Sequence, residues 1–277
     1  MTTTVGADLD DATRVVPSDD GERLTATLSD AWEIWGPNGG YLAAIALRAA
    51  ATQAQIAQPV SFYCHFLSSA RFDEVDLDVT MLRAGRRSEA LAVHMGQDGK
   101  PILHAMVRTA ADGVGHDHQY ARAPDVPTPD ELRTLDELIG PENARFFPFW
   151  DNLERCPVPQ DLPKPGGDPV VRDWARFRPT PCFDDPFLDA ARSLILLDTY
   201  GYPASWQKYR DDQPPAPNLD TAAWFHRPSP DCEWLLIDEQ CVAGDRGLIG
   251  ISGRVWDTDG RLVASGGAQL VCLDGPA

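Results

Sequence analysis

The segment Pro37-Asn38-Gly39-Gly40-Tyr41 is the first candidate for ligand chemistry. It opens an apolar, alanine-rich run in which Arg48 is the only charged residue as far as Gln58. This composition predicts a helix that is buried on nearly every side. The N–H groups at its start lack partners within the helix and lie at the positive end of the helix dipole. Gly39, Gly40 and Tyr41 are therefore candidate substrate-binding residues for an anionic or carbonyl oxygen. The alternative is a core helix with a glycine-lined start.

Two polar residues of the second half stand in apolar surroundings. Asp198 follows the run Leu194–Leu197, so we expect it beside the core, where burial raises the pKa of a carboxyl group. An aspartate at a helix end is ordinarily a solvated turn residue, so this position alone does not make Asp198 catalytic. Gln269 lies in an otherwise apolar strand. An unpaired amide there is costly, so Gln269 requires a partner, catalytic or structural.

Other motifs are weaker or absent. Arginines near predicted turns could bind phosphate groups or simply solubilise the sheet edges; they are Arg83, Arg86, Arg87 and Arg246. His116 and His118 have a metal-ligand spacing, but no further ligand is near, so we expect a solvated pair. The sequence has no G-x-S-x-G, H-E-x-x-H, P-loop or G-x-G-x-x-G motif.

Composition narrows the class of protein. The 277 residues carry 42 acidic and 24 basic side chains, for a net charge of −18. This balance argues against general nucleic-acid binding, which needs a basic surface. The N-terminal residues lack the basic and apolar regions of a signal peptide, and we expect no membrane span. Six scattered cysteines without a C-x-x-C pair indicate free thiols in a reducing compartment, so a cytoplasmic location is expected.

The predicted elements fall into two similar series. Alternation and turn signals predict strands at 23–28, 60–67, 75–81, 89–95 and 102–108 around the first helix. In the second series they predict strands at 170–178, 222–226, 234–237, 248–256 and 262–272 around a helix at 187–197. Residues 1–22 are expected to be a frayed leader. The proline-rich stretch 113–168 is expected to be a linker with a short helix at 130–138, held down by the aromatic patch 146–150.

Two turns recur at nearly the same spacing. Asp98-Gly99 in the first series corresponds to Asp259-Gly260 in the second, and Ala84-Gly85 corresponds to Ala243-Gly244. The shared order of elements indicates an internal repeat. We therefore predict an α+β protein of two units, residues 23–112 and 169–277, each an antiparallel sheet curled around one apolar helix. The first helix contains no acid that could act as a base, whereas the second ends beside Asp198.

The segments that carry this pattern resemble the type II acyl-CoA thioesterases. They are Gly39-Gly40, Phe62–Leu67, Asp98–Ile102, Leu219-Asp220, Trp224-Phe225-His226-Arg227-Pro228, Trp234–Leu236, Arg246-Gly247, Asp259-Gly260, Leu262–Ser265 and Gln269. The resemblance covers about residues 22–110 and 170–273. It implies a double hotdog fold, with two antiparallel sheets that each wrap around a long apolar helix. It also implies a homo-oligomer of double hotdogs.

The resemblance also implies an activity, the hydrolysis of acyl-CoA to free acid and CoA. The family uses an Asp, a Thr or Ser, and a Gln, which fall here on Asp198, Asn218 and Gln269. Asn218 departs from the pattern, because its amide can orient a water but cannot relay a proton. No metal or redox cofactor is implied. The alternatives are an acyl-CoA or lipid-binding protein without hydrolysis, and a hotdog enzyme that acts on a protein-bound thioester. The Asp-x-Asn-Pro-x-His signature of hotdog hydratases is missing, which argues against dehydration.

Overall fold

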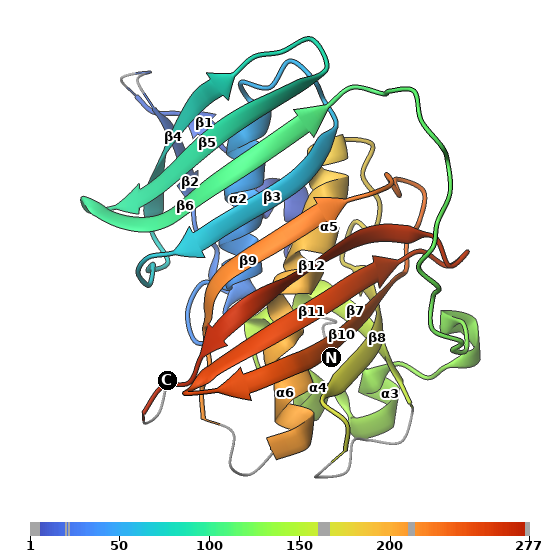
Figure 1. Cartoon of the computed structure of the whole chain (residues 1–277). Helices are drawn as coiled ribbons and strands as arrows, with labels where there is room; N and C mark the ends of the chain where they lie inside the picture. The colour runs from blue at the N-terminus through green and yellow to red at the C-terminus, as the bar shows by residue number, and fades with distance from the viewer. Residues whose placement is uncertain (1–5, 20, 22, 160–166, 210–213, 275–277) are drawn as a thin grey trace.

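A computed structural model describes residues 6–19, 21, 23–159, 167–209 and 214–274. Its strands form one antiparallel sheet in the order β1-β2-β4-β5-β6-β3-β9-β12-β11-β10-β8-β7 (Figure 1). The prediction of two sheets is therefore wrong. The two units merge because β3 (Pro59–Phe66) pairs with β9 (Asn218–Phe225) along the middle of the molecule.

The strand order confirms the internal repeat. Read from the centre outward, β3-β6-β5-β4-β2 in one half is matched by β9-β12-β11-β10-β8 in the other. The remaining strands of the first half are β2 (Leu24–Thr27), β4 (Glu74–Arg83), β5 (Ser88–Gln97) and β6 (Lys100–Ala110). Those of the second half are β8 (Val170–Phe177), β10 (Leu235–Asp245), β11 (Leu248–Trp256) and β12 (Leu262–Val271). Asp98 and Gly99 have φ of 49° and 75°, as the predicted hairpin turn requires.

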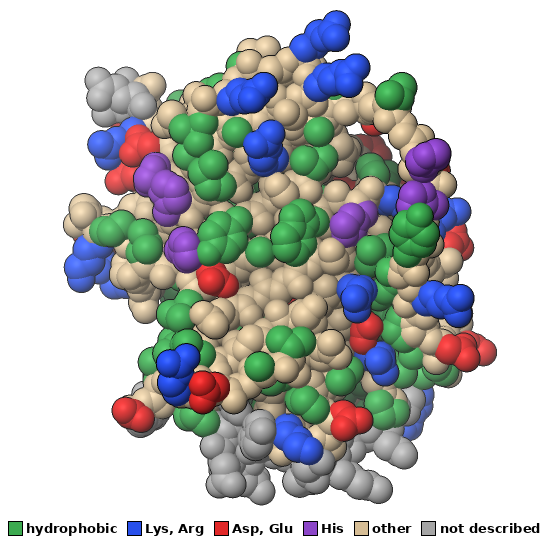
Figure 2. Space-filling view, in the orientation of Figure 1, with side chains coloured by type: hydrophobic (Ala, Val, Ile, Leu, Met, Phe, Trp, Pro, Cys, Tyr) green, Lys and Arg blue, Asp and Glu red, His purple; other side chains and the backbone are tan. Residues whose placement is uncertain are grey.

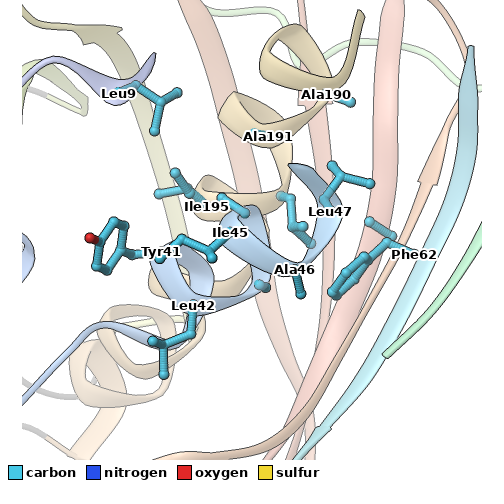
Figure 3. Packing of buried hydrophobic residues seen from close by; sticks show 14 of the residues in the cluster. Leu9, Tyr41, Leu42, Ile45, Ala46, Leu47, Phe62, Ala190, Ala191 and Ile195 are labelled. Atoms are coloured by element: carbon cyan, nitrogen blue, oxygen red, sulfur yellow. The ribbon is translucent and has the colours of Figure 1, made fainter. Parts of the chain in front are cut away.

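Two helices lie against each other on the inner face of the sheet (Figures 1 and 3). In α2 (Gly39–Ala51) every residue from Gly40 to Leu47 is buried, and in α5 (Pro186–Thr199) every residue after Pro186 is buried. Alanines on both helices permit close packing, and a Cβ on Gly40 would lie only 2.8 Å from the Cα of Ile195. The start of α2 therefore meets the end of α5.

The N-terminal segment is packed rather than frayed. Of residues 1–22, the positions 1–5, 20 and 22 lie outside the described residues. The remainder forms α1 (Leu9–Ala12) and the short strand β1 (Val16–Pro17) beside β2. Leu9 is buried in the main core, and Ala7 N–H donates to Asn152 Oδ1 at 2.7 Å.

The predicted linker is also largely structured, apart from residues 160–166, which lie outside the described residues. It contains β7 (Leu153–Val158), which pairs with β8 and ends the sheet. In place of one helix at 130–138 it has η2 (Pro129–Glu131) and α3 (Leu135–Ile139), followed by α4 (Pro141–Ala144) and η3 (Pro148–Asn152).

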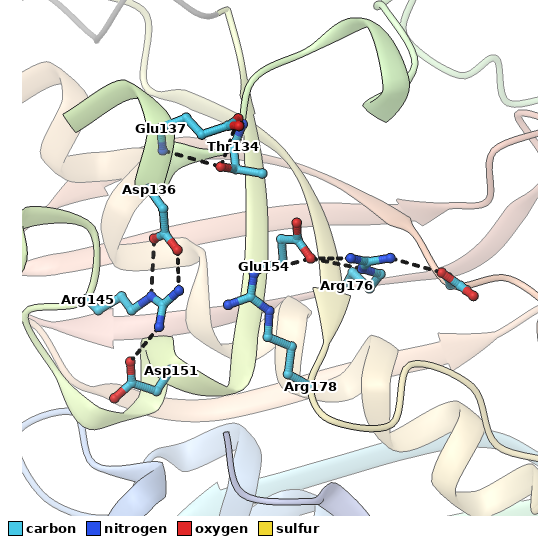
Figure 4. Close-up of polar contacts among 9 residues, drawn as sticks. Thr134, Asp136, Glu137, Arg145, Asp151, Glu154, Arg176 and Arg178 are labelled. Carbon is cyan, nitrogen blue, oxygen red and sulfur yellow. Dashed lines mark hydrogen bonds and ion pairs between the residues drawn. The ribbon is translucent and has the colours of Figure 1, made fainter. Parts of the chain in front are cut away.

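Arginine pairs hold this segment in place (Figure 4). Arg145 bridges Asp136 and Asp151, while Arg176 and Arg178 of the second half both bind Glu154 in β7.

Two further helices are η1 (Asp30–Trp32) and α6 (Gly201–Tyr209). Within the described ranges, no helix is long and apolar enough to cross a membrane.

Candidate active site

Asp198 lies in the last turn of α5 with its carboxylate beneath the start of β9. Its side chain is buried, with 4% of the residue exposed. Oδ1 accepts a hydrogen bond from Asn218 Nδ2 at 2.8 Å and another from the Thr221 hydroxyl at 2.5 Å. The backbone N–H of Gly40 also donates to this carboxylate. Asp198 and Asn218, both predicted to be catalytic, are therefore in direct contact although they are 20 residues apart in the chain.

A bulge in β9 turns Asn218 toward Asp198. Asp220 pairs with Gln269 and Asn218 pairs with Leu270, so Leu219 is left without a partner in β12. One extra residue reverses the side-chain alternation of the strand. Residues two apart in a regular strand share a face, but because of the bulge Asn218 faces inward while Asp220 faces outward. Its Nδ2 also donates to the Asp198 carbonyl oxygen at 2.8 Å, which fixes the amide.

Thr221 is a site residue that the sequence reasoning missed. It is fully buried and pairs across the sheet with Ala268, another inward-facing residue. The resemblance places a hydroxyl at position 218, whereas this chain supplies one from position 221. The alternation of buried positions at Thr221, Ala223 and Phe225 was the available signal.

The start of α2 forms the opposite wall. Asn38 caps the helix through Oδ1, which accepts from Tyr41 N–H at 2.9 Å, while its Nδ2 donates to Thr199 Oγ1 at 3.2 Å. A Cβ on Gly39 would lie 2.8 Å from Asp198 Oδ2, so a larger residue would displace this carboxylate. The positive end of the α2 dipole thus lies against the Asp198 carboxylate.

Burial dominates the electrostatics of this carboxylate. It raises the pKa of Asp198 above its ordinary value, while hydrogen bonds from Thr221, Asn218 and Gly40 oppose this effect by stabilising the charged form. Glu239, buried nearby without a hydrogen-bond partner among the described residues, has a pKa raised well above its ordinary value by burial and by the charge of Asp198. Glu239 is thus the more readily neutral of the two acids.

A cavity of about 320 Å³ opens beside Asp198. Its wall combines the segment before α2, the loop after β3, and the segments around α6 and the start of β9. The lining residues are Ile34–Gly39, Leu42, Phe66–Ala70, Asp198, Thr199, Tyr202 and Ala216–Asn218. Asp198 is the only charged residue among them. In the described part of the chain, no three His, Cys, Asp or Glu residues are grouped to hold a metal.

The structure places two predicted site residues away from this cavity. Gln269 is exposed, because its inward-facing neighbours Ala268 and Leu270 turn its side chain to the outer face of the sheet. Tyr41 is fully buried; its hydroxyl donates to Ala12 O at 2.8 Å and accepts from Ser29 N–H. Gln269 therefore cannot orient a water beside Asp198 in this arrangement, and Tyr41 supports the core.

The two candidate arginines differ in position. Arg86 lies in the β4–β5 turn, where Figure 2 shows basic side chains gathered at the upper end of the sheet. The end of α2 lies against the middle of β4, since Gln53 donates to Val79 O, whereas the cavity adjoins the start of α2. Arg246 lies at the cavity end: the adjacent Gly247 accepts from Cys272 N–H at 2.7 Å, and Leu273 N–H donates to Pro215 O. Neither arginine lines the cavity.

Comparison with known proteins identifies the class. The model of the acyl-CoA thioesterase N-terminal domain matches residues 28–110, and that of the C-terminal domain matches residues 121–273. The fold and these matches define a thioester hydrolase with a hotdog fold. The chain belongs to the acyl-CoA thioesterase family.

Solved structures share the whole architecture. A hotdog-fold protein of unknown function from Alicyclobacillus acidocaldarius is 22% identical, with a TM-score of 0.80, over 97% of this chain and 98% of that one. The acyl-CoA thioesterase II TesB2 from Mycobacterium marinum is 21% identical, with a TM-score of 0.77, over 97% and 99%. The tesB protein from Mycobacterium avium subsp. paratuberculosis is 21% identical, with a TM-score of 0.79, over 98% and 100%. At these identities the likeness concerns the fold.

Proposed function

We propose that the protein hydrolyses acyl-CoA thioesters with Asp198 as the general base. The observation that carries this proposal is the buried Asp198 carboxylate at the cavity wall, held on Oδ1 by Asn218 and Thr221. These donors orient the carboxylate and favour its charged form, so that it can accept a proton although burial raises its pKa.

The reaction requires one water. Asp198 takes a proton from the water as its oxygen attacks the thioester carbonyl carbon. The tetrahedral intermediate then expels the CoA thiolate, and the proton passes from Asp198 to the thiolate or to solvent. Asn218 donates to Asp198 through Nδ2, which leaves its Oδ1 to accept a hydrogen bond from the attacking water.

The start of α2 stabilises the negative charge that develops on the carbonyl oxygen. Gly39 lines the cavity and presents its N–H at the positive end of the helix. Gly40 N–H is directed at Asp198 instead. In this proposal Thr221 takes the place that the resemblance assigned to a hydroxyl at position 218, and Gln269 has no catalytic role. Arg246 remains a candidate for contact with the CoA phosphates outside the cavity.

The test uses purified protein, a series of acyl-CoA thioesters and a reagent that detects free thiols. We expect release of CoA by the native protein. The Asp198→Asn variant should bind acyl-CoA in calorimetry without releasing thiol. Binding by the native protein without release would instead identify an acyl-CoA-binding protein that has lost hydrolysis.

A further inference from the structure

The cavity beside Asp198 is lined mainly by aromatic and aliphatic side chains. Trp35, Phe66 and Tyr202 contribute rings, and Ile34 and Leu42 contribute aliphatic surface. Among the residues that the structure describes, Asp198 is the only charged one that lines the cavity, and no described lysine or arginine does so. A carboxylate on a bound acyl group would therefore meet the like charge of Asp198 and no counter-ion from the described lining, whereas a neutral acyl group would bury apolar surface.

Trp35 is held at this cavity in an uncommon backbone conformation. Its φ is 55°, in the left-handed region that a bulky residue rarely adopts. The surrounding loop enforces this conformation: Ile34 N–H donates to Gly36 O at 2.8 Å, Asn38 N–H to Trp32 O at 3.0 Å, and Phe149 N–H to Glu33 O at 3.3 Å. Backbone strain that a structure over-determines in this way is characteristic of functional sites.

The indole of Trp35 is only partly covered by protein. It makes edge contacts with Tyr202 at 4.9 Å and Phe147 at 6.3 Å between ring centroids, yet 43% of the residue is exposed. The three rings come from the first half, the linker and the second half. Trp35 and Tyr202 form an aromatic wall on one side of the cavity, and Phe147 contacts Trp35 without lining the cavity.

The cavity is small, and the described residues of α2 and α5 that line it are Gly39, Leu42, Asp198 and Thr199. Its volume of about 320 Å³ is at the lower end of the range of about 300–1,000 Å³ for small-molecule sites. The helices close its inner side, since Gly40 is in contact with Ile195, and Ala43, Ala44 and Ile45 are fully buried. A long acyl chain therefore cannot continue from Asp198 along the helix pair.

On the basis of the proposed function, we propose that this site takes thioesters of uncharged acyl groups of short to medium length, and that Trp35 sets the length limit. Each methylene buried against the lining raises kcat/KM about fourfold. The gain ends when the chain reaches Trp35 and Tyr202, because further methylenes must remain in water or displace the indole.

The experiment measures kcat/KM for a series from acetyl-CoA to hexadecanoyl-CoA, together with succinyl-CoA and glutaryl-CoA. We expect kcat/KM to rise about fourfold per methylene to a maximum at a medium chain length, with no further gain up to hexadecanoyl-CoA. For the two carboxylated substrates, kcat/KM should be at least tenfold lower than for neutral acyl groups of the same chain length. Trp35→Gly removes the indole and suits the left-handed backbone, and it should move the maximum to a longer chain. Tyr202→Leu removes the other ring of the aromatic wall, on α6, and should also move the maximum to a longer chain.

The matched control is Trp224→Ala, which removes a tryptophan that is 55% exposed on the outer face of the sheet; it should leave the maximum unchanged. A continuous rise to hexadecanoyl-CoA, equal rates for carboxylated and neutral substrates, or an unchanged maximum in folded Trp35→Gly would overturn the inference. These outcomes differ from failure of the proposed function, in which no thioester is hydrolysed or Asp198→Asn retains full activity.

Discussion

At the scale of single residues, the charge state of Asp198 depends on two opposing effects. Burial disfavours the carboxylate, and three donors on β9 and α2 favour it. A general base must be ionised at the working pH, so each donor sets the lower pH limit of activity. Thr221 contributes a hydroxyl from a fully buried position.

The Thr221→Val substitution should therefore raise the pKa of Asp198. A hydrogen bond to a charged group contributes about 1.5–3 kcal/mol, which corresponds to a shift of about 1–2 pKa units. We expect the acidic limb of the kcat/KM profile to move to higher pH by about that amount. The matched control is Thr27→Val, an exposed threonine in β2. An acidic limb that stays in place would show that Thr221 does not act on Asp198.

At the scale of elements, catalysis depends on how closely the start of α2 approaches the end of α5. Gly39 and Gly40 differ in what lies next to them. A Cβ on Gly39 would meet the ends of the Asp198 and Phe66 side chains at 2.8 and 3.0 Å. A Cβ on Gly40 would meet the α5 backbone at Ile195 Cα.

Gly39→Ala and Gly40→Ala should consequently fail in different ways. In Gly39→Ala the side chains can shift, so we expect a loss of about tenfold or more in kcat/KM with a thermal midpoint near that of the native protein. In Gly40→Ala the helices must separate, so we expect overpacking to cost about 1–3 kcal/mol. Activity assays and urea unfolding distinguish the two. Equal stability losses in both variants would contradict this account of the helix contact.

These elements could be predicted from the sequence to different degrees. The strands and both central helices follow from alternation and apolar runs, which local sequence determines. Strand β7 was missed because Leu153–Val158 contains Pro157 and lies in a stretch rich in proline, a composition that indicates a linker. The pairing of β3 with β9 joins residues far apart in the chain, and no local pattern specifies it.

The site was predictable only in part for the same reason. Asp198 follows an apolar run, so its burial could be inferred. Asn218 faces inward because of the bulge at Leu219, which the sequence does not mark. For Gln269, the alternation of Ala268 and Leu270 indicated an outward side chain, whereas the resemblance assigned it to the site.

Another contact between elements links β8 to the end of α5. The Tyr200 hydroxyl donates to Asp173 Oδ2 at 2.9 Å in the core. Burial raises the pKa of Asp173 from 3.8 to about 7, although Arg155 and Tyr200 oppose the shift. A carboxyl whose pKa is higher in the folded state contributes stability that is fully present below the unfolded pKa and is lost as the pH rises through the folded one.

We therefore expect stability to fall as the pH rises from about 4 to about 7. In Asp173→Asn, which keeps an acceptor for Tyr200, the decrease between pH 5 and pH 7 should be smaller by about 2 kcal/mol. Part of the slope should remain, because the pKa of Glu239 is shifted in the same direction. Urea unfolding at several pH values measures this, with the exposed Asp259→Asn as control. An unchanged slope would show that Asp173 is not protonated in the folded protein.

At the scale of the whole molecule, two related halves produce one site. By the repeat, the start of α5 and the segment after β9 correspond to the start of α2 and the loop after β3. In the second half, buried side chains occupy the position that corresponds to the cavity. Arg192 and Asp189 form a buried ion pair, Ser229 N–H donates to Asp189 at 2.7 Å, and Arg192 donates to Ser229 O, Pro181 O and Cys232 O.

Arg192→Met should therefore destabilise the fold. It leaves Asp189 buried without its cation, and breaking one side of a buried pair costs about 3–5 kcal/mol. The free energy of unfolding in urea measures this loss. Arg254→Met, on the exposed face of β11, should change it by less than about 0.5 kcal/mol. A loss below about 1 kcal/mol for Arg192→Met would mean that this network does not stabilise the second half.

The central claim is that Asp198 activates water and does not attack the thioester itself. A single turnover with excess enzyme in ¹⁸O-labelled water tests it directly. We predict label in the released acid and none in the peptide that contains Asp198, because the water oxygen attacks the acyl carbon. Label in the Asp198 carboxylate would contradict the account, since it requires a covalent acyl-aspartyl intermediate.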